Sequence, residues 1–350
     1  MYKITPPSIS NGNIQAKRNS SVELLRIFAI LMIISMHLMG KWWTTSSIIN
    51  RELILFFNSF FNTGSSLFIL ISGYYRLNFK IEKALHLWFQ TLTYTIPLLF
   101  LSWFLLDITI GGKFILHSFF PILTNYKWFI TSYLILYILS PFINLFVEQL
   151  SERQLRSLIL VGCIFFILSP TVLLISIQND AGKGIVNMFL VYIIGRYIRL
   201  YGVPSCIVKN RKSIACLCIL LTFIGNSILT NLKGQISVYY AYDCSLFILC
   251  LSIIFFSIFI DLELDSPFIN SLAKYCFPIY LFSDFVWLLL MPYIEYFQNS
   301  YFCWLIMPCF LVLAILMTVL YEKIRQLLFD KIEKNILKVL KFKYDNYFKN

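Results

Sequence analysis

Long apolar stretches separated by short polar connections dominate the chain between residues 22 and 321. A helix that spans a bilayer needs about 20 predominantly apolar residues. Ten stretches meet this requirement: 22–42, 52–75, 84–107, 127–148, 155–177, 185–201, 212–230, 237–260, 274–295 and 301–321. The pattern predicts an all-α fold, a polytopic membrane bundle of about ten transmembrane helices. The bundle forms one domain, 22–321, flanked by an N-terminal tail, 1–21, and a C-terminal tail, 322–350.

Three segments depart from a plain spanning pattern. The stretch 111–123 is apolar but short and is broken by glycine and proline, which favours an interfacial segment. Pro278 and Pro292 lie inside the ninth stretch and predict a kink there. The tail 322–350 alternates basic and apolar residues, a pattern typical of an amphipathic helix that lies on anionic lipid.

The composition argues for a membrane protein and against a soluble one. Hydrophobic residues make up 59% of the 350 residues, and charged residues only 13%. Soluble domains carry about 25% charged residues, enough to cover a globule. The nine cysteines lie mostly in apolar stretches without zinc-ligand spacing, so we expect no metal site.

The basic residues are distributed unequally over the two sides of the predicted bundle. The net charge is +12, and with the N-terminus inside, most Lys and Arg residues fall in the tails and in alternate loops on one side. The basic residues on the opposite side are Lys41, Arg51, Lys113, Lys127, Lys183 and Lys233. The positive-inside rule therefore predicts that both termini of this multi-pass membrane protein are cytoplasmic. Because no polar domain accompanies the charge, it indicates topology rather than nucleic-acid binding.

Two ionisable residues, Arg26 and His37, interrupt the first apolar stretch. Such a group inside a membrane helix is costly and suggests a functional site. In an α-helix the two side chains are about 20° apart in azimuth and about 16 Å apart along the axis, so they share one face. Glu23 precedes Arg26 by three residues and can pair with it. Arg26 alone could snorkel to headgroups and His37 alone could pack in the core, but the pair predicts a polar path inward from the cytoplasm.

Polar residues also flank the first and second stretches. Asn19-Ser20-Ser21 supplies N-cap residues for the first helix. After the second stretch, Ser72-Gly73-Tyr74-Tyr75-Arg76 leads to Lys80 and Lys83, which are three residues apart at a helix start. These two lysines can form a phosphate site, or they can simply mark the cytoplasmic side.

Several motifs, in this order, resemble those of the acyltransferase-3 family of membrane O-acyltransferases. That family carries an Arg, ten residues and then a His in its first helix, as Arg26 and His37 do here. The other similar segments are Gly64 to Phe68 with Ser72-Gly73-Tyr74, Lys80-x-x-Lys83, Trp128-Phe129 with Tyr133, Leu139 to Asn144, and Ile269-Asn270 with Phe277 to Leu281. The resemblance covers about residues 18–325.

The resemblance implies an acyl-CoA-dependent O-acyltransferase with acetyl-CoA as co-substrate and no tightly bound cofactor. The acyl group, commonly acetyl, would pass from the cytoplasm to a hydroxyl of a capsular, secreted or wall polysaccharide or of a lipid-linked sugar. Neutral His37 would accept the hydroxyl proton, and Arg26, which stays charged, would bind the donor. The other donor-side candidates are Arg76, Lys80 and Lys83 for the CoA phosphates, with Glu23, Ser72 and Tyr74 as supporting residues.

Aromatic and acidic residues are expected to bind the sugar on the outer side. The candidates are Trp128, Tyr133, Tyr242 and Asp243, with Tyr239 as a further aromatic residue. An interfacial aromatic belt is the alternative explanation for the rings. Asp243 could either bind hydroxyls, orient His37 or face water.

The chain departs from the family pattern at three places. Ser283 stands where a late His is often found, so the role of that His is absent or carried by another group. Pro278 stands where Gly is usual. The Lys80 and Lys83 pair replaces Arg-x-x-Arg, which keeps the charge but loses bidentate phosphate recognition.

Two other classes of membrane protein share some of these features. A glycan flippase or transporter of the cell envelope would carry charges across many helices, whereas here the deep ionisable residues concentrate in the first helix. A glycan polymerase or ligase depends on a large outer loop rich in Arg and His, whereas the loop at 108–126 holds one His and one Lys. The flippase is therefore the principal alternative to the acyltransferase.

Overall fold

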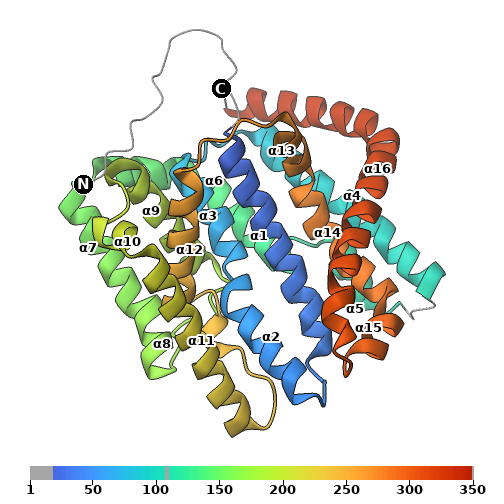
Figure 1. The fold of residues 1–350 in the computed structure, drawn as a ribbon. Helices are drawn as coiled ribbons and strands as arrows, with labels where there is room; N and C mark the ends of the chain where they lie inside the picture. The colour runs from blue at the N-terminus through green and yellow to red at the C-terminus, as the bar shows by residue number, and fades with distance from the viewer. Residues whose placement is uncertain (1–18, 107–109, 349–350) are drawn as a thin grey trace.

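The computed structural model describes residues 19–106 and 110–348, and residues 341–348 by their backbone alone. All regular elements in this part of the chain are helices (Figure 1), which confirms the predicted all-α class. Nine helical stretches among the described residues are long and apolar enough to cross a membrane. Most of the predicted N-terminal tail, residues 1–18, lies outside the described residues.

The helices follow the predicted stretches. The first eight are α1 (Ser20–Met39), α2 (Ile48–Phe61), α3 (Gly64–Tyr74), α4 (Ile81–Leu106), α5 (Gly112–Phe119), α6 (Trp128–Gln149), α7 (Glu152–Cys163) and α8 (Ser169–Leu173). The others are α9 (Ile185–Tyr201), α10 (Ser205–Lys209), α11 (Arg211–Lys233), α12 (Leu246–Ile260), α13 (Pro267–Leu272), α14 (Cys276–Leu289), α15 (Met291–Phe297) and α16 (Phe302–Phe348). The apolar segment 111–123 thus holds one short helix, α5, rather than a span.

Helix α9 occupies the sixth predicted stretch but, with 17 residues, is shorter than the nine candidate spans. At 1.5 Å per residue it is about 25 Å long, which is near the lower limit for a bilayer core. It packs along α3, where a Cβ on Gly73 would lie 2.3 Å from the Tyr192 carbonyl oxygen and one on Gly195 would lie 2.6 Å from that of Leu70. Such close crossing at small residues is typical of helix pairs in membranes, and it places α9 inside the bundle.

Three of the predicted spanning stretches are interrupted in the structure. The second is divided into α2 and α3 at Thr63, whose Oγ1 donates to Phe60 O at 2.7 Å. The fifth contains a π-helical turn, Ile164–Leu168, between α7 and α8. The ninth does not merely kink: α14 ends at Leu289, and Pro292 stands at the start of α15. Proline lacks the backbone N–H that would continue the hydrogen-bond ladder, so a new helix begins there.

The predicted C-terminal tail is a continuation of the last span. Helix α16 runs unbroken from Phe302 to Phe348, and it bends and crosses the end of the bundle at which α1 begins (Figure 1). We call this end the terminal end and the opposite one the far end. At the middle of α16, buried Arg325 pairs with Glu322 at 2.8 Å, and Tyr94 of α4 donates to Glu322 at 2.6 Å. These contacts fix α16 to α4.

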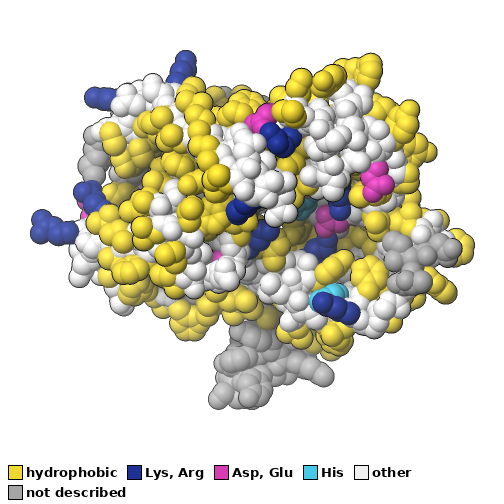
Figure 2. All heavy atoms as spheres, turned by 90° about the horizontal axis from the view of Figure 1, so that it is seen from below, with side chains coloured by type: hydrophobic (Ala, Val, Ile, Leu, Met, Phe, Trp, Pro, Cys, Tyr) yellow, Lys and Arg dark blue, Asp and Glu magenta, His cyan; other side chains and the backbone are white. Residues whose placement is uncertain are grey.

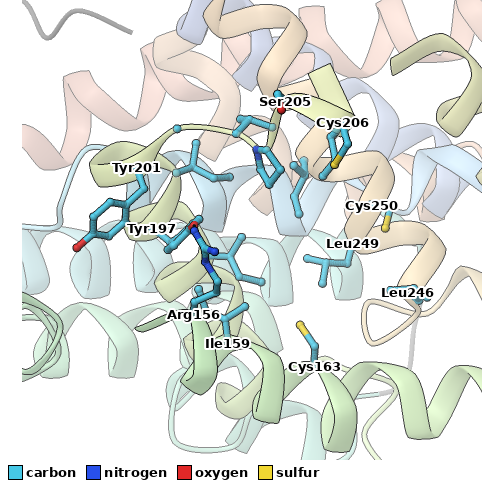
Figure 3. A pocket seen from close by; sticks show the side chains of 17 residues that line it. Arg156, Ile159, Cys163, Tyr197, Tyr201, Ser205, Cys206, Leu246, Leu249 and Cys250 are labelled. Carbon is cyan, nitrogen blue, oxygen red and sulfur yellow. The ribbon is translucent and has the colours of Figure 1, made fainter. Parts of the chain in front are cut away.

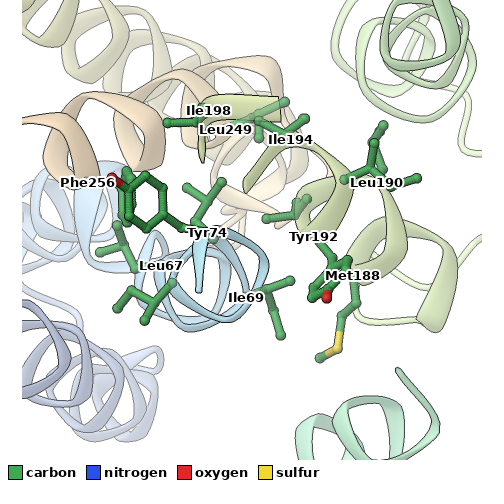
Figure 4. Close-up of a cluster of buried hydrophobic side chains, with 14 of the residues drawn as sticks. Leu67, Ile69, Tyr74, Met188, Leu190, Tyr192, Ile194, Ile198, Leu249 and Phe256 are labelled. Carbon is green, nitrogen blue, oxygen red and sulfur yellow. The ribbon is translucent and has the colours of Figure 1, made fainter. Parts of the chain in front are cut away.

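Two hydrophobic clusters hold the helices together, and α1 contributes to both. The first joins α1 with α3, α9 and α12, and it includes Leu67, Tyr192 and Phe256 (Figure 4). The second joins α1 with α14 and α16 through residues such as Ile34 and Trp287. Because lipid is as apolar as these side chains, close packing rather than exclusion of water stabilises such contacts. Helix α1 therefore lies between the two halves of the bundle, where its polar residues face internal space.

Candidate active site

Helix α1 is fixed at its start by the polar residues that precede the apolar stretch. The Asn19 side chain accepts a hydrogen bond from Ser21 N at 3.0 Å, as expected of an N-cap residue. Ser21 Oγ donates to Leu262 O at 2.6 Å, which ties α1 to the connection between α12 and α13. This anchor places Arg26 near the terminal end and His37 further along the helix, towards the far end.

A cavity of about 320 Å³ lies beside the first half of α1, and we call it the inner cavity. Its walls are mostly apolar and aromatic, with two cations, Arg26 and Lys274. Arg26 Nη1 donates to Glu23 at 3.0 Å, the pairing expected from their spacing, and 38% of the Arg26 side chain is exposed. Arginine has five N–H donors, so Arg26 can bind a further anion while it is paired. Ser72 and Tyr133 also line this cavity.

A second cavity, of about 280 Å³, lies towards the far end, and we call it the outer cavity. His37 lines it together with the predicted acceptor residues Trp128, Tyr242 and Asp243. The other polar and aromatic lining residues are Trp43, Asn58, Phe61, Asn62, Ser65, Phe129, Lys183 and Tyr280. Aromatic faces combined with amide, hydroxyl and carboxylate groups suit a polar ring-shaped ligand with several hydroxyls.

Three side chains line both cavities: Ile33 of α1, Phe129 of α6 and Tyr280 of α14. The rings of Phe129 and Tyr280 have their centroids 5.8 Å apart. Ile33 is buried and packs against Gly64 of α3, where an added Cβ would lie only 2.6 Å from Ile33 Cγ1. We call these three side chains the partition, because one cavity lies on each side of them.

His37 lies beside a carboxylate and an ammonium group. Its Nδ1 is 3.6 Å from Asp284 Oδ1, within ion-pair range but longer than a hydrogen bond, and Asp284 Oδ2 accepts from Lys127 Nζ at 2.7 Å. Lys127 is buried, and the adjacent Asp284 carboxylate favours the charged form of its ammonium group. The arrangement can hold a neutral imidazole with Nδ1–H towards Asp284, which leaves Nε2 free to accept a proton.

Figure 2 shows the far end of the molecule directly. Its periphery is largely hydrophobic, while basic, acidic and histidine side chains gather around a hollow near the centre. Ionisable groups inside a membrane bundle ordinarily face its interior or a water-filled cavity. The far end therefore presents a polar hollow within an apolar rim, on the side of the bundle where the outer cavity lies.

The remaining donor-side candidates are not lining residues of either cavity. Arg76 Nε donates to Glu148 at 2.8 Å. Lys80 and Lys83 are exposed next to the start of α4. Arg26 thus shares the inner cavity with Lys274, whereas Arg76, Lys80 and Lys83 do not line that cavity.

Two aromatic candidates, Tyr133 and Tyr74, do not line the outer cavity. Tyr133 lies with Arg26 in the inner cavity, whereas Trp128, one turn earlier on α6, lines the outer one. Tyr74 is buried, and its hydroxyl accepts from Arg199 Nη1 at 3.2 Å. Tyr74 therefore supports the packing of α3 rather than lining a cavity.

Sequence reasoning missed three charged residues of the site. Lys127 and Lys274 appeared to be topology signals, yet the structure places one beside Asp284 and the other in the inner cavity. Asp284 follows Ser283, which is buried and donates to Tyr280 O at 3.4 Å. A carboxylate inside a predicted span was the signal that could have identified Asp284.

Asp284, rather than Asp243, is the carboxylate within ion-pair range of His37. Asp243 lines the outer cavity as well, where it accepts a hydrogen bond from Ser65 Oγ. The two carboxylates therefore occupy different surroundings. One is paired with a cation next to the histidine, and the other is bound to a hydroxyl.

A larger cavity of about 580 Å³ lies elsewhere, between α7, α9, α10 and α12 (Figure 3). Its walls are mainly apolar, with Arg156 on α7 and the thiols of Cys163, Cys206 and Cys250. It contains neither of the paired α1 residues and, among its lining residues, no carboxylate or imidazole. Its size alone does not make it the candidate site.

Among the described residues, no group of three or more His, Cys, Asp or Glu side chains is placed to hold a metal ion. In a comparison with protein families, the model of a family described as an acyltransferase domain matches residues 19–323. The matched range includes both cavities and the partition. Comparisons with curated proteins and with solved structures give no match.

Proposed function

The chain belongs to the acyltransferase 3 family, and from this membership we propose that it moves an acetyl group from cytoplasmic acetyl-CoA to a hydroxyl of a cell-surface or lipid-linked glycan. The chain is a multi-pass membrane acyltransferase. The single observation that carries the finer proposal is the relation of the two cavities. Arg26 lines one, His37 lines the other, and three side chains line both.

The proposed reaction is a direct transfer between two bound substrates. The acceptor hydroxyl oxygen attacks the thioester carbonyl carbon, so that a C–O bond forms and the C–S bond breaks. His37 Nε2 accepts the hydroxyl proton, and the CoA thiolate takes up a proton as it leaves. A neutral imidazole suits this role because its ordinary pKa lies near the operating pH, and general-base catalysis contributes about 10²–10⁴-fold.

The inner cavity supports the donor half of the proposal. A CoA ester has an anionic nucleotide end and a long, thin arm that ends in the thioester. The apolar wall suits the arm, and Arg26 and Lys274 offer positive charge to the anionic end. Arg76, Lys80 and Lys83 would add positive charge outside the cavity, provided that the terminal end is cytoplasmic, as the excess of basic residues predicts.

The outer cavity supports the acceptor half. Trp128 and Tyr242 offer aromatic faces for a sugar ring, and Asp243 offers a carboxylate to its hydroxyls. Asp284 is proposed as a positioning residue that orients His37, with Lys127 keeping Asp284 ionised. In this proposal the far end faces outward from a bacterial plasma membrane.

The test is transfer of label in membrane vesicles of known sidedness. Acetyl-CoA labelled in the acetyl group is supplied to the cytoplasmic face, and base-labile label in the glycan is measured. We expect incorporation with the wild type and none above background with His37→Ala, at equal protein levels in the membrane. Wild-type incorporation with His37→Ala would exclude the general-base role. Movement of glycan across the vesicle membrane without ester formation would instead support the flippase alternative.

A further inference from the structure

The cavity between α7, α9, α10 and α12, which we call the lateral cavity, is separate from both cavities of the proposed reaction. None of its lining residues lines the inner or the outer cavity. Its volume of about 580 Å³ lies within the range of about 300–1,000 Å³ that is usual for ligand sites. An occupant of the lateral cavity is therefore a third ligand, distinct from the proposed donor and acceptor.

The helices around the lateral cavity lie at the periphery of the bundle. The span that contains α7 and the span of α11, which packs against α12, are the least buried of the candidate spans in the described chain, each with 22% of its residues buried. Large apolar side chains of both helices are exposed, among them Leu160 on α7 and Leu217 on α11. In a membrane these surfaces face lipid, so the lateral cavity draws its occupant from the bilayer.

Apolar walls extend inward from one polar end of the lateral cavity. Its lining residues run from Arg156 to Cys163 on α7, from Ile194 to Tyr201 on α9 and from Leu246 to Ile253 on α12 (Figure 3). Each run covers about 10 Å of helix axis. Water finds few hydrogen-bond partners along such walls, whereas an alkyl chain makes the same apolar contacts there as in the bilayer.

The polar end of the lateral cavity lies towards the terminal end and is positively charged. Arg156 lines it, with 64% of its side chain exposed. Its Nη2 donates to Glu152 and, at 3.1 Å, to Tyr197 Oη, so Nε and Nη1 can bind a further anion. Asp261 pairs with Arg211 nearby. The basic residues of α7, α10 and the first turn of α11 are Arg153, Arg156, Lys209, Arg211 and Lys212, and the acidic residue of these segments is Glu152.

We propose that the lateral cavity binds an anionic phospholipid from the leaflet at the terminal end, with the phosphate beside Arg156 and an acyl chain between α7, α9 and α12. Basic pockets between membrane helices bind anionic headgroups in this way. The acyl chain is surrounded by apolar groups in the bilayer as in the cavity, so the charge at the polar end determines which lipid is bound. The site is independent of the proposed transfer reaction, because the two share no lining residue.

The headgroup is tested by native mass spectrometry of the full chain in detergent, titrated with phosphatidylglycerol or with phosphatidylcholine of the same acyl chains. We expect phosphatidylglycerol to bind at least about fivefold more tightly and Arg156→Gln to remove this preference. Arg153→Gln is the matched control, since Arg153 is an exposed residue of the same helix that does not line the cavity. It should change the affinity by no more than about twofold.

The acyl chain is tested by Cys163→Phe, which places a ring in the lateral cavity and should weaken the binding of both lipids. Cys216→Phe is the same exchange at an exposed position of α11 and should leave binding unchanged, with thermal unfolding as the check that each variant is folded. Equal affinity for the two lipids in the wild type, or unchanged binding in Arg156→Gln or in folded Cys163→Phe, would overturn the proposal. A lipid-free dimer that is lost in Cys163→Phe would assign the cavity to a second copy of the chain instead.

Discussion

The inner and outer cavities share three side chains, yet they differ in nearly every other respect. The inner cavity has apolar and aromatic walls with the cations Arg26 and Lys274, and no carboxylate is among its lining residues. The outer cavity also has many apolar and aromatic lining residues, but it adds two amides, a carboxylate and His37, with Lys183 as its cation. The first suits a ligand recognised by its charge and an apolar arm, and the second suits one recognised by many hydrogen bonds. Under the proposed function, one short helix face would serve two unlike substrates, each of which meets a different end of it.

The largest expected effect tests whether acyl transfer takes place in the outer cavity. His37→Ala should lower kcat by about 10²–10⁴-fold, because the general base is lost, while the KM for acetyl-CoA changes little. Steady-state kinetics with labelled acetyl-CoA measures both. His117→Ala is the matched control, since His117 stacks on Tyr126 and lines neither cavity. An equal loss of kcat in both variants would contradict a catalytic role for His37.

A smaller effect is expected from Asp284→Asn. Without the carboxylate the imidazole is no longer oriented, and kcat should fall by about 10²-fold. This is less than the ~10⁴-fold loss known for the carboxylate of a catalytic triad, because the distance of 3.6 Å here is longer than a hydrogen bond. Kinetics at fixed acceptor concentration measures the change.

The variant also leaves Lys127 buried without its partner, which is destabilising in itself. Asp284→Asn combined with Lys127→Met should restore the level of folded protein but not kcat. Asp243→Asn is a comparison within the same cavity and should raise the acceptor KM more than it lowers kcat. A full recovery of kcat in the double variant would reduce Asp284 to a structural partner of Lys127.

The inner cavity is tested by Arg26→Gln. Loss of a charge-assisted hydrogen bond to an anionic donor costs about 1.5–3 kcal/mol, so the KM for acetyl-CoA should rise at least about tenfold. The acceptor KM should not change, because Arg26 does not line the outer cavity. A rise in the acceptor KM with no change for acetyl-CoA would reverse the proposed assignment of the two cavities.

The exposed lysines beside α4 should matter less than Arg26. Lys80→Gln with Lys83→Gln should raise the donor KM about two- to fivefold, more than it lowers kcat, because exposed charges contribute about 1 kcal/mol or less. The rise should shrink as ionic strength increases. Measuring the donor KM at low and high salt distinguishes a contribution of these lysines to donor binding from a role in membrane orientation alone. An unchanged donor KM at low salt means that the two lysines only mark the side of the membrane.

The smallest effect on catalysis is expected where neither cavity is touched. Gly73→Ala places a Cβ 2.3 Å from Tyr192 O at the crossing of α3 and α9, and overpacking of this kind costs about 1–3 kcal/mol. The midpoint of thermal unfolding in detergent should fall by a few degrees, with both KM values unchanged in the protein that remains folded. Gly40→Ala is the control, since no atom lies within 4 Å of its added Cβ. An equal loss of stability in both variants would contradict the role of the crossing.

The sequence predicted the helices well because spanning a bilayer imposes a length and a composition that can be counted. It also placed Arg26 and His37 on one face, because helical spacing fixes azimuth without tertiary information. It did not divide α2 from α3 at Thr63, where no proline marks the break and where the next residue, Gly64, lies against Ile33 of α1.

The site was only partly predictable for a related reason. Lys127 and Asp284 are 157 residues apart in the chain, and no local pattern links them. Tyr133 was grouped with Trp128 by proximity in sequence, but the partition passes between them. Local spacing assigns residues to a helix face, whereas the wall between two cavities is built from three helices at once.

The partition has a consequence for the membrane itself. An enzyme whose two substrates meet from opposite sides contains a path through the bilayer, and a continuous aqueous path would conduct ions. Ile33, Phe129 and Tyr280 line both cavities, at the place where such a path would pass from one to the other. Each elementary charge that leaks across 100 mV dissipates about 2.3 kcal/mol. Under the proposed function, these three side chains would therefore also keep the ionic solutions on the two sides of the membrane apart.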